Sequence, residues 1–302
     1  MGYNDVIKIE DSDGVQRVIS ELTKLAKSGK YVFRGYSKQD EILPSIIRDK
    51  VNYEDVEGEL LYGFERYGSH YFHATTSIDF MSSAQHFGLP TRLLDFTYNP
   101  FIALSFALYG RKGTNYKETG DKTYYYIRYA ALEDNICITG IPLNDDLYNI
   151  KFTRTDSLAT KACQSIDKVT GLFGKNNIVT SDVASLIGLK NTEIVAQAHQ
   201  KMKDRVILFI DPNQANQRII MQQGLFMFPY TLDKEEHLDI VKRNSSLLMI
   251  HKDLREDLLK YLDTLGFTSF RLMPDLASVC SAVTRKVTDE RANKSELFKK
   301  KR

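Results

Sequence analysis

A strand joined to a helix by one tight connection constrains the fold more than any other feature of this sequence. Residues 78–86 are typical of the end of a helix, and Gly88-Leu89-Pro90 breaks it, since proline lacks a backbone donor and disfavours helix in the residue before it. Residues 92–97 then predict a buried strand. Asn99-Pro100 follows as a helix start, with an apolar helix expected over residues 101–109.

Hydrophobic periodicity assigns the rest of the chain to an α+β fold. We expect helices over residues 15–27, 56–76, 158–173, 181–198, 254–265 and 276–287, and strands over 31–35, 123–129, 206–210, 219–230 (broken at Gly224), 247–250 and 270–275. The run 123–129 is expected at a sheet edge. We divide the chain into core segments 1–129 and 205–287, an inserted helical lobe at 130–204 and a basic tail at 288–302.

The charge of the chain is unevenly distributed. Residues 285–302 hold eight Lys or Arg against three acidic residues, a net +5, so the other residues carry −3 of the total of +2. Such a tail can add sequence-independent affinity for nucleic acid, and a solvated terminus is the alternative. With 42% apolar and 26% charged residues, the composition argues against disorder of the body.

The cysteines and the hydropathy pattern exclude several classes of protein. Cys137, Cys163 and Cys280 form no CxxC pair, and His and Cys residues show no metal-ligand spacing. No apolar run approaches the length of a membrane span. We therefore expect reduced thiols, no metal, no membrane segment and a cytoplasmic location.

Three segments place polar residues inside apolar strands. They are Phe33-Arg34-Gly35, the stretch from His86 to Thr97, and the segment from Arg218 to Phe228 with its run Gln222-Gln223-Gly224-Leu225-Phe226. A charged group in a buried strand costs free energy unless it is paired or binds a ligand. Two interpretations follow from the residue types. Either Arg34 or Arg92 pairs with Asp95 in an internal network, or these residues form a ligand site.

The same segments resemble the FRG domain. The similarity rests on the Phe-Arg-Gly triplet at residues 33–35, the block 85–97 with Asn99-Pro100 and the apolar helix after it, and the run Gln222-Gln223-Gly224-Leu225-Phe226. The terminal Pro274-Asp275 fits the same pattern. The resemblance extends from about residue 15 to residue 287, with the helical lobe as its variable part.

A more distant resemblance is to ADP-ribosyltransferases of the arginine class, which share a strand ending in aromatic-Arg-Gly and a hydroxyl-bearing strand that runs into an apolar helix. It implies a split mixed β-sheet core flanked by helices, which binds NAD without a metal. On this resemblance Arg34 and Arg92 would contact the dinucleotide, Gly35 would let the backbone approach the nicotinamide, Thr97 would lie on the hydroxyl strand and Tyr31 would stack on the nicotinamide ring.

The resemblance leaves the identity of the catalytic group open. Many members of that class have a glutamate on a late strand, where this chain has Gln222 and Gln223. Either Asp95 supplies the carboxylate, or Gln222 orients the ribose without charge, or catalysis has been lost. His86 is a candidate general base for the acceptor nucleophile, and a structural hydrogen bond in its turn is the alternative.

The resemblance implies an NAD-dependent mono-ADP-ribosyltransferase, acting as a toxin or phage-defence effector with an antitoxin as a possible partner. Its acceptor would be nucleic acid, with single-stranded RNA favoured, or protein. One alternative is a non-catalytic FRG module that binds a nucleotide or a protein partner. A metal-dependent nuclease is the least supported, because Asp95 has no companion acid at ligand spacing. Tyrosines in 124–129 are candidates for base stacking, although an edge strand explains them more simply.

Overall fold

The computed structural model describes a mixed sheet flanked by helices, and the fold is α+β. The described residues are 5–11, 13–48, 53–72, 74, 77–109, 123–138, 159–160, 163–164, 192–212, 217–272, 280, 283, 284 and 287. The following account is of these residues. The predicted helices at 158–173 and 276–287, the predicted end of the last strand at 273–275 and the basic tail fall wholly or largely outside them.

Eight strands form one sheet in the order β1-β8-β4-β2-β3-β7-β6-β5. Their bounds are β1 Val6–Ile9, β2 Tyr31–Tyr36, β3 Leu94–Thr97, β4 Tyr124–Ala131, β5 Ile136–Ile138, β6 Leu208–Ile210, β7 Gly224–Met227 and β8 Ser246–His251. The outer pairs β1–β8 and β5–β6 are parallel, and every other pair is antiparallel. The sheet is therefore mixed, with an antiparallel centre.

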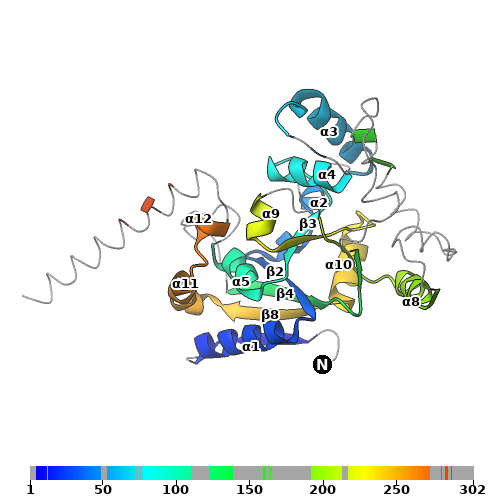
Figure 1. The fold of residues 1–302 in the computed structure, drawn as a ribbon. Helices are drawn as coiled ribbons and strands as arrows, with labels where there is room; N and C mark the ends of the chain where they lie inside the picture. Colours follow the sequence, from blue (N-terminus) through cyan, green and yellow to red (C-terminus); the bar gives the residue numbers. More distant parts are fainter. Residues whose placement is uncertain are drawn as a thin grey trace, which may run out of the picture.

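Helices cover both faces of the sheet (Figure 1). On one face α1 (Gly14–Ser28), α5 (Pro100–Tyr109) and α11 (Arg255–Thr264) pack in a single apolar cluster. On the other, a second cluster takes residues from α3 (Tyr53–Gly68), α4 (Ser77–His86) and α10 (Lys234–Arg243). The shorter helices are α2 (Ser45–Arg48), α8 (Thr192–Lys203), α9 (Gln217–Met221), α12 (Ser269–Leu272) and the 3-10 turns Gln39–Ile42 and Lys252–Leu254.

The pairing between strands β2 and β3 is very short. These strands are paired at a single position, Phe33 with Thr97, whereas β2 and β4 are paired along six. Beyond that one pair the two backbones diverge, and side chains rather than a strand ladder must satisfy the polar groups there. This divergence is where Arg34 and Asp95 lie.

The connection predicted around Pro90 is confirmed. Helix α4 ends at His86, Gly88 has a φ of 95°, and β3 runs through Tyr98 and Asn99 into α5. The Asn99 side chain accepts a hydrogen bond from the Phe101 N–H at 2.9 Å, as expected of an N-cap. Gly29, with a φ of 65°, ends α1 where the sequence predicts a stop.

Three expectations about the secondary structure are wrong, and some elements were not predicted. The run predicted as an edge strand is β4, which lies inside the sheet between β8 and β2. Residues 217–221 form helix α9, and the strand begins only at Gly224. Residues 269–272 form helix α12, not a strand. Strand β1 and helix α10 were not predicted, and neither was β5, which lies in the segment 130–204 that was expected to be helical.

The position of β4 decides the role of its tyrosines. Tyr125, Tyr126 and Tyr129 are 2%, 8% and 4% exposed, so these rings are core residues and offer no stacking surface. The sheet also continues beyond residue 129, because β4 ends at Ala131 and β5 pairs with β6. No helix of the described residues is long and apolar enough to cross a membrane.

Candidate functional site

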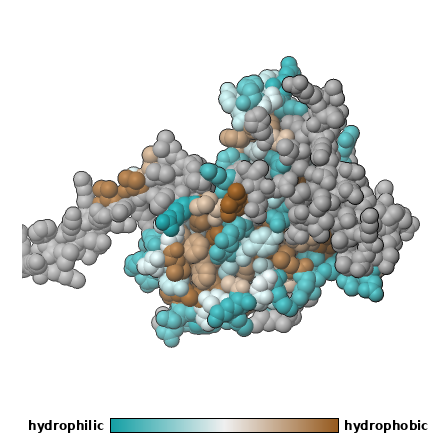
Figure 2. Space-filling model, in the orientation of Figure 1, coloured by the Kyte–Doolittle hydropathy of each residue, from teal (hydrophilic) through white to brown (hydrophobic). Residues whose placement is uncertain are grey.

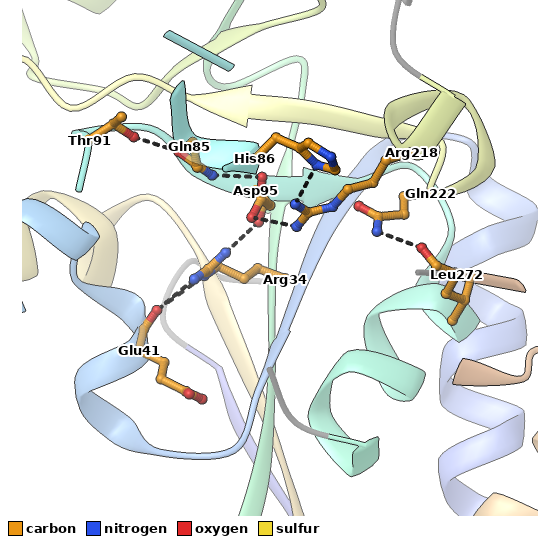
Figure 3. A network of polar contacts seen from close by, with 9 residues as sticks. All are labelled: Arg34, Glu41, Gln85, His86, Thr91, Asp95, Arg218, Gln222 and Leu272. Atoms are coloured by element: carbon orange, nitrogen blue, oxygen red, sulfur yellow. Dashed lines mark hydrogen bonds and ion pairs between the residues drawn. The ribbon is translucent and has the colours of Figure 1, made fainter. Parts of the chain in front are cut away.

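Arg34 lies where β2 and β3 diverge, and backbone carbonyls hold its guanidinium (Figure 3). Its Nη1 donates to the Asp95 carbonyl oxygen at 2.6 Å, and its Nη2 donates to the Glu41 carbonyl oxygen at 2.7 Å. Arg34 therefore satisfies a carbonyl of β3 that the missing ladder leaves unpaired. The expected ion pair between Arg34 and the Asp95 carboxylate is not the contact observed, since the acceptor is the backbone.

The Asp95 carboxylate has other neighbours. Its Oδ1 accepts a hydrogen bond from the Gln85 amide at 2.9 Å, and its Oδ2 lies 3.9 Å from Arg218 Nη2. Thr91 Oγ1 in turn donates to Gln85 Oε1 at 2.6 Å, which orients the amide. The side chain of Asp95 is 40% exposed, so the carboxylate is oriented by its neighbours and still reaches solvent.

His86 joins this cluster through Arg218. The ring Nδ1 of His86 lies 3.3 Å from Arg218 Nη1. An arginine side chain only donates, so Nδ1 is the acceptor and the proton of the neutral ring is on Nε2. We call Arg34, Asp95, His86 and Arg218 the arginine–aspartate cluster; it brings together side chains from β2, β3, α4 and α9 (Figure 3).

Thr97 and Gln222 lie next to this cluster but are enclosed. Thr97 Oγ1 donates to the Gln222 carbonyl oxygen at 2.7 Å and accepts from the Asn99 N–H at 3.0 Å. The Gln222 amide donates to the Leu272 carbonyl oxygen at 2.7 Å. Thr97 is 2% exposed and Gln222 is 5% exposed. Both side chains tie α9 and α12 to the sheet.

Tyr31 and Gly35 lie on the face of β2 that Arg34 does not share. Alternation along a strand places Val32 and Arg34 on one side and Phe33 and Gly35 on the other. The Tyr31 ring meets the Tyr129 ring edge-to-face at 5.6 Å. A Cβ at Gly35 would lie 1.6 Å from the Ala103 carbonyl oxygen of α5. The space that the glycine leaves is filled by a helix, and these two residues are not brought together with Arg34.

Arg92 is buried in an ion pair that the sequence did not identify. Its Nη2 lies 2.6 Å from Glu57 Oε2, its Nη1 donates to the Pro229 carbonyl oxygen, and both side chains are about 5% exposed or less. Glu57 on α3 is three and four residues before Leu60 and Leu61, on the apolar stripe of that helix, which is a signal that it is buried. Arg92 therefore lies apart from the arginine–aspartate cluster.

The ionisable groups beside Arg34 respond to its charge. Burial alone would raise the pKa of Glu41, but backbone N–H donors from Ser37 and Lys38 and the charges of Arg34 and Arg48 leave it below its usual value. Burial lowers the pKa of His237 to about 4, and Arg34 adds to that effect. The His237 ring is neutral and donates through Nε2 to the Ile42 carbonyl oxygen. The positive charge of Arg34 is thus set between an ionised carboxylate and a neutral ring.

Arg218 was missed as a site residue. It begins the third of the polar segments, but the pattern there predicts a strand over residues 219–230, whereas Arg218 lies on helix α9. Among the described residues no group of three or more His, Cys, Asp or Glu side chains could hold a metal ion. The expectation of a metal-free site stays a prediction.

Comparison with known proteins identifies one domain. Residues 29–115 match the family model of the FRG domain. They include β2, α3, α4, β3 and α5, and with them three members of the arginine–aspartate cluster. No curated protein and no solved structure matches the chain.

Proposed function

Because residues 29–115 form an FRG domain, we propose that the protein is a cytoplasmic NAD-dependent mono-ADP-ribosyltransferase. The observation that supports the proposal is that Arg34 is hydrogen-bonded to the backbone carbonyl of Asp95 while Arg218 lies beside the half-exposed carboxylate of the same residue. Two guanidinium groups and one carboxylate carry a net positive charge, which suits the pyrophosphate of a dinucleotide better than a neutral ligand.

Arg34 and Arg218 would bind the phosphates in different ways. Arg34 is anchored to the carbonyls of Asp95 and Glu41, so its charge is positioned before any ligand arrives. Arg218 is 27% exposed on a five-residue helix and lies 3.9 Å from Asp95, a distance that leaves their ion pair loose. A phosphate can compete for such a side chain more easily than for a closely paired one.

Asp95 would act at the ribose. The chemistry that NAD supplies is the transfer of ADP-ribose with nicotinamide as the leaving group. A carboxylate near the ribose stabilises the positive charge that develops on the sugar as the glycosidic bond breaks. Asp95 is the carboxylate of the cluster, and the Gln85 amide fixes its orientation. Thr97 and Gln222 would act only by holding the surrounding backbone.

His86 would accept the proton of the attacking nucleophile, and Arg218 controls whether it can. While Nδ1 accepts from Arg218, the unprotonated nitrogen of the ring is occupied. A phosphate that draws Arg218 away would expose Nδ1 as a base. The dinucleotide would thereby activate His86, so that a nucleophile is deprotonated only when the donor is bound.

We extend the proposal to a toxin or phage-defence effector that modifies a nucleic acid, with RNA favoured over protein, and that an antitoxin restrains. The support is the +5 charge of the last eighteen residues, which favours a polyanionic acceptor.

The test is transfer of label from NAD to separate pools of RNA, DNA and cell protein, with nicotinamide release measured in parallel. We expect Arg218→Gln to weaken NAD binding and Asp95→Asn, which keeps an acceptor for Gln85, to lose turnover with little change in binding. Arg243→Gln is the matched control, because Arg243 is an exposed arginine paired with Asp239 at 2.6 Å on α10. Equal activity in Arg218→Gln and Arg243→Gln would refute the site.

The non-catalytic FRG module is the second candidate. It is favoured by one observation, that the buried Gln222, which stands where the transferase class has a glutamate, donates its amide to the Leu272 carbonyl oxygen. This candidate predicts nucleotide binding that Arg218→Gln weakens, with no nicotinamide release from the unmodified protein in the presence of any acceptor pool.

A further inference from the structure

The end of α3 exposes a short run of aromatic and basic side chains. Tyr67 is 70% exposed and Tyr71 is 77% exposed, the two highest values among the large apolar and aromatic side chains described. The Arg66 guanidinium carbon lies 5.4 Å from the centroid of the Tyr67 ring, and the His70 and Tyr71 rings are 4.8 Å apart. We call Arg66, Tyr67, His70 and Tyr71 the α3 aromatic patch.

In this segment the phenylalanines pack against the core and the tyrosines are exposed. Phe64 and Phe72 stack on one another at 4.6 Å and both contact Phe80 of the core. Tyr67 and Tyr71 instead point away from that cluster. Single exposed rings are common on protein surfaces. Here two neighbouring pairs, Arg66 with Tyr67 and His70 with Tyr71, are separated by only Gly68 and Ser69, and together they offer a preformed surface for a flat partner.

We propose that the α3 aromatic patch binds single-stranded nucleic acid by base stacking. Residues 66–71 contain two tyrosines, a histidine and an arginine, and neither an aliphatic side chain nor a carboxylate. A protein partner is expected to meet an apolar centre, which this surface lacks. Aromatic rings interleaved with cations are the combination that binds single strands, because every base has a flat face and each nucleotide carries a phosphate.

Stacking rather than charge supplies most of the affinity. The patch lies at the C-terminal end of α3, where the helix dipole is negative and opposes anions. Arg66 and His70 offset that field and are placed to contact one or two phosphates. For one or two contacts, the logarithm of the binding constant changes with the logarithm of salt concentration with a slope of about −0.7 to −1.4.

The patch is distinct from the arginine–aspartate cluster but belongs to the same domain. Helix α3 packs on α4, and α4 carries His86 at its last residue (Figure 1). Binding at the patch needs no NAD and no turnover. A failure of the proposed transferase activity therefore leaves this proposal to be judged by itself.

The test is fluorescence anisotropy with a labelled single-stranded RNA roughly 12 nucleotides long, without NAD, over a range of salt concentrations. We expect the double variant Tyr67→Ala/Tyr71→Ala to bind roughly 5- to 160-fold more weakly, the range found when one stacked base loses its aromatic partner. The variant Tyr67→Phe/Tyr71→Phe should keep its affinity, because it keeps both rings.

Tyr62→Ala is the matched control. Tyr62 is an exposed tyrosine on the same helix, at 47% exposure, but it lies five residues before Tyr67 and hydrogen-bonds to Thr160. Thermal unfolding checks that each variant is folded. The proposal is overturned if the double alanine variant binds RNA as tightly as Tyr62→Ala. It is also overturned if folded unmodified protein binds no RNA, the outcome expected if the patch serves a protein partner.

Discussion

Replacing Gly35 with alanine should destabilise the whole fold. The added Cβ would lie 1.6 Å from the Ala103 carbonyl oxygen, 2.5 Å from its carbonyl carbon and 2.9 Å from the Ala107 nitrogen. Contacts below 3.0 Å essentially never occur, so α5 must move away from β2 by at least about 1.4 Å, the difference between 3.0 and 1.6 Å. All three atoms are backbone, and no side-chain rotation relieves the contact.

The cost follows from what that helix movement loosens. Helix α5 is buried along most of its length against β2, and close-packed interiors tolerate such shifts poorly. Forced overpacking typically costs 1–3 kcal/mol, and because this contact is with backbone we expect about 3 kcal/mol or more. For a chain of 302 residues the midpoint of thermal unfolding should fall by roughly 5 °C.

The assay is urea and thermal unfolding of Gly35→Ala beside Gly63→Ala. A Cβ at Gly63 meets nothing within 4 Å, and this residue lies inside α3, so the control should be neutral or stabilised by about 1 kcal/mol. A Gly35→Ala protein within about 1 kcal/mol of the unmodified chain would refute the packing role. If that stable variant had lost NAD binding, Gly35 would serve ligand approach as the resemblance implies.

Two further perturbations test the buried charges. Glu57→Leu should lower the free energy of urea unfolding by about 3–5 kcal/mol, because it leaves Arg92 buried without its partner. Adding Arg92→Met should restore most of this loss. A double variant that is no more stable than Glu57→Leu would contradict the ion-pair account. The pKa of His237 in the folded protein is about 4, below its usual 6.5. Between these two values the unfolded chain binds a proton that the folded protein does not bind. The free energy of unfolding is therefore unaffected above pH 6.5 and decreases as the pH falls toward 4. Measured by urea unfolding at several pH values, the loss of stability should reach about 3 kcal/mol. His237→Gln should remove this pH dependence. The same pH dependence in His237→Gln and in the unmodified protein would contradict the assignment to His237.

Local signals in the sequence were sufficient where they act over a few residues. Gly29 ends α1 and Asn99 caps α5, because a left-handed turn and a side-chain acceptor are requirements of the chain itself. Strand β1 could not be predicted, since only Ile9 of its four residues is buried and the strand is stabilised by pairing with β8, far along the chain. The run 269–272 fits a strand or a helix equally well by pattern, and only tertiary contacts select the helix.

The position of β4 could not be predicted for a related reason. A run of tyrosines suits an edge strand, where a hydroxyl can reach water on either face. In this fold both faces of β4 are covered by helices, and Tyr125 packs with α1, α5 and α11 while Tyr126 stacks on Tyr36 at 5.3 Å. Tyr125, Tyr126 and Tyr129, which were candidates for stacking on a ligand, therefore pack in the core. The exposed tyrosines lie instead at the end of α3.

The candidate site was predicted in part, and strand alternation explains much of what was missed. Arg34, Asp95 and His86 were expected together and do lie in one cluster. Tyr31 and Gly35 are an odd number of residues from Arg34, so a strand over residues 31–36 necessarily turns them to the opposite face. That inference was available from the sequence.

Arg218 is the member of the arginine–aspartate cluster for which a ligand can compete most easily. Most polar side chains of the strand segments are bound to other parts of the protein. Arg34 donates hydrogen bonds to two backbone carbonyls, Thr97 donates to the Gln222 carbonyl oxygen, and Arg92 forms an ion pair with Glu57. A space-filling view places the part of the molecule that includes α9 on an outer face with mixed polar and apolar side chains (Figure 2). Arg218 reaches Asp95 from a helix of five residues, and its 3.9 Å separation is the loosest ion pair described. A ligand that competes for this arginine would change the partners of Asp95 and His86 together while the strands stay in place.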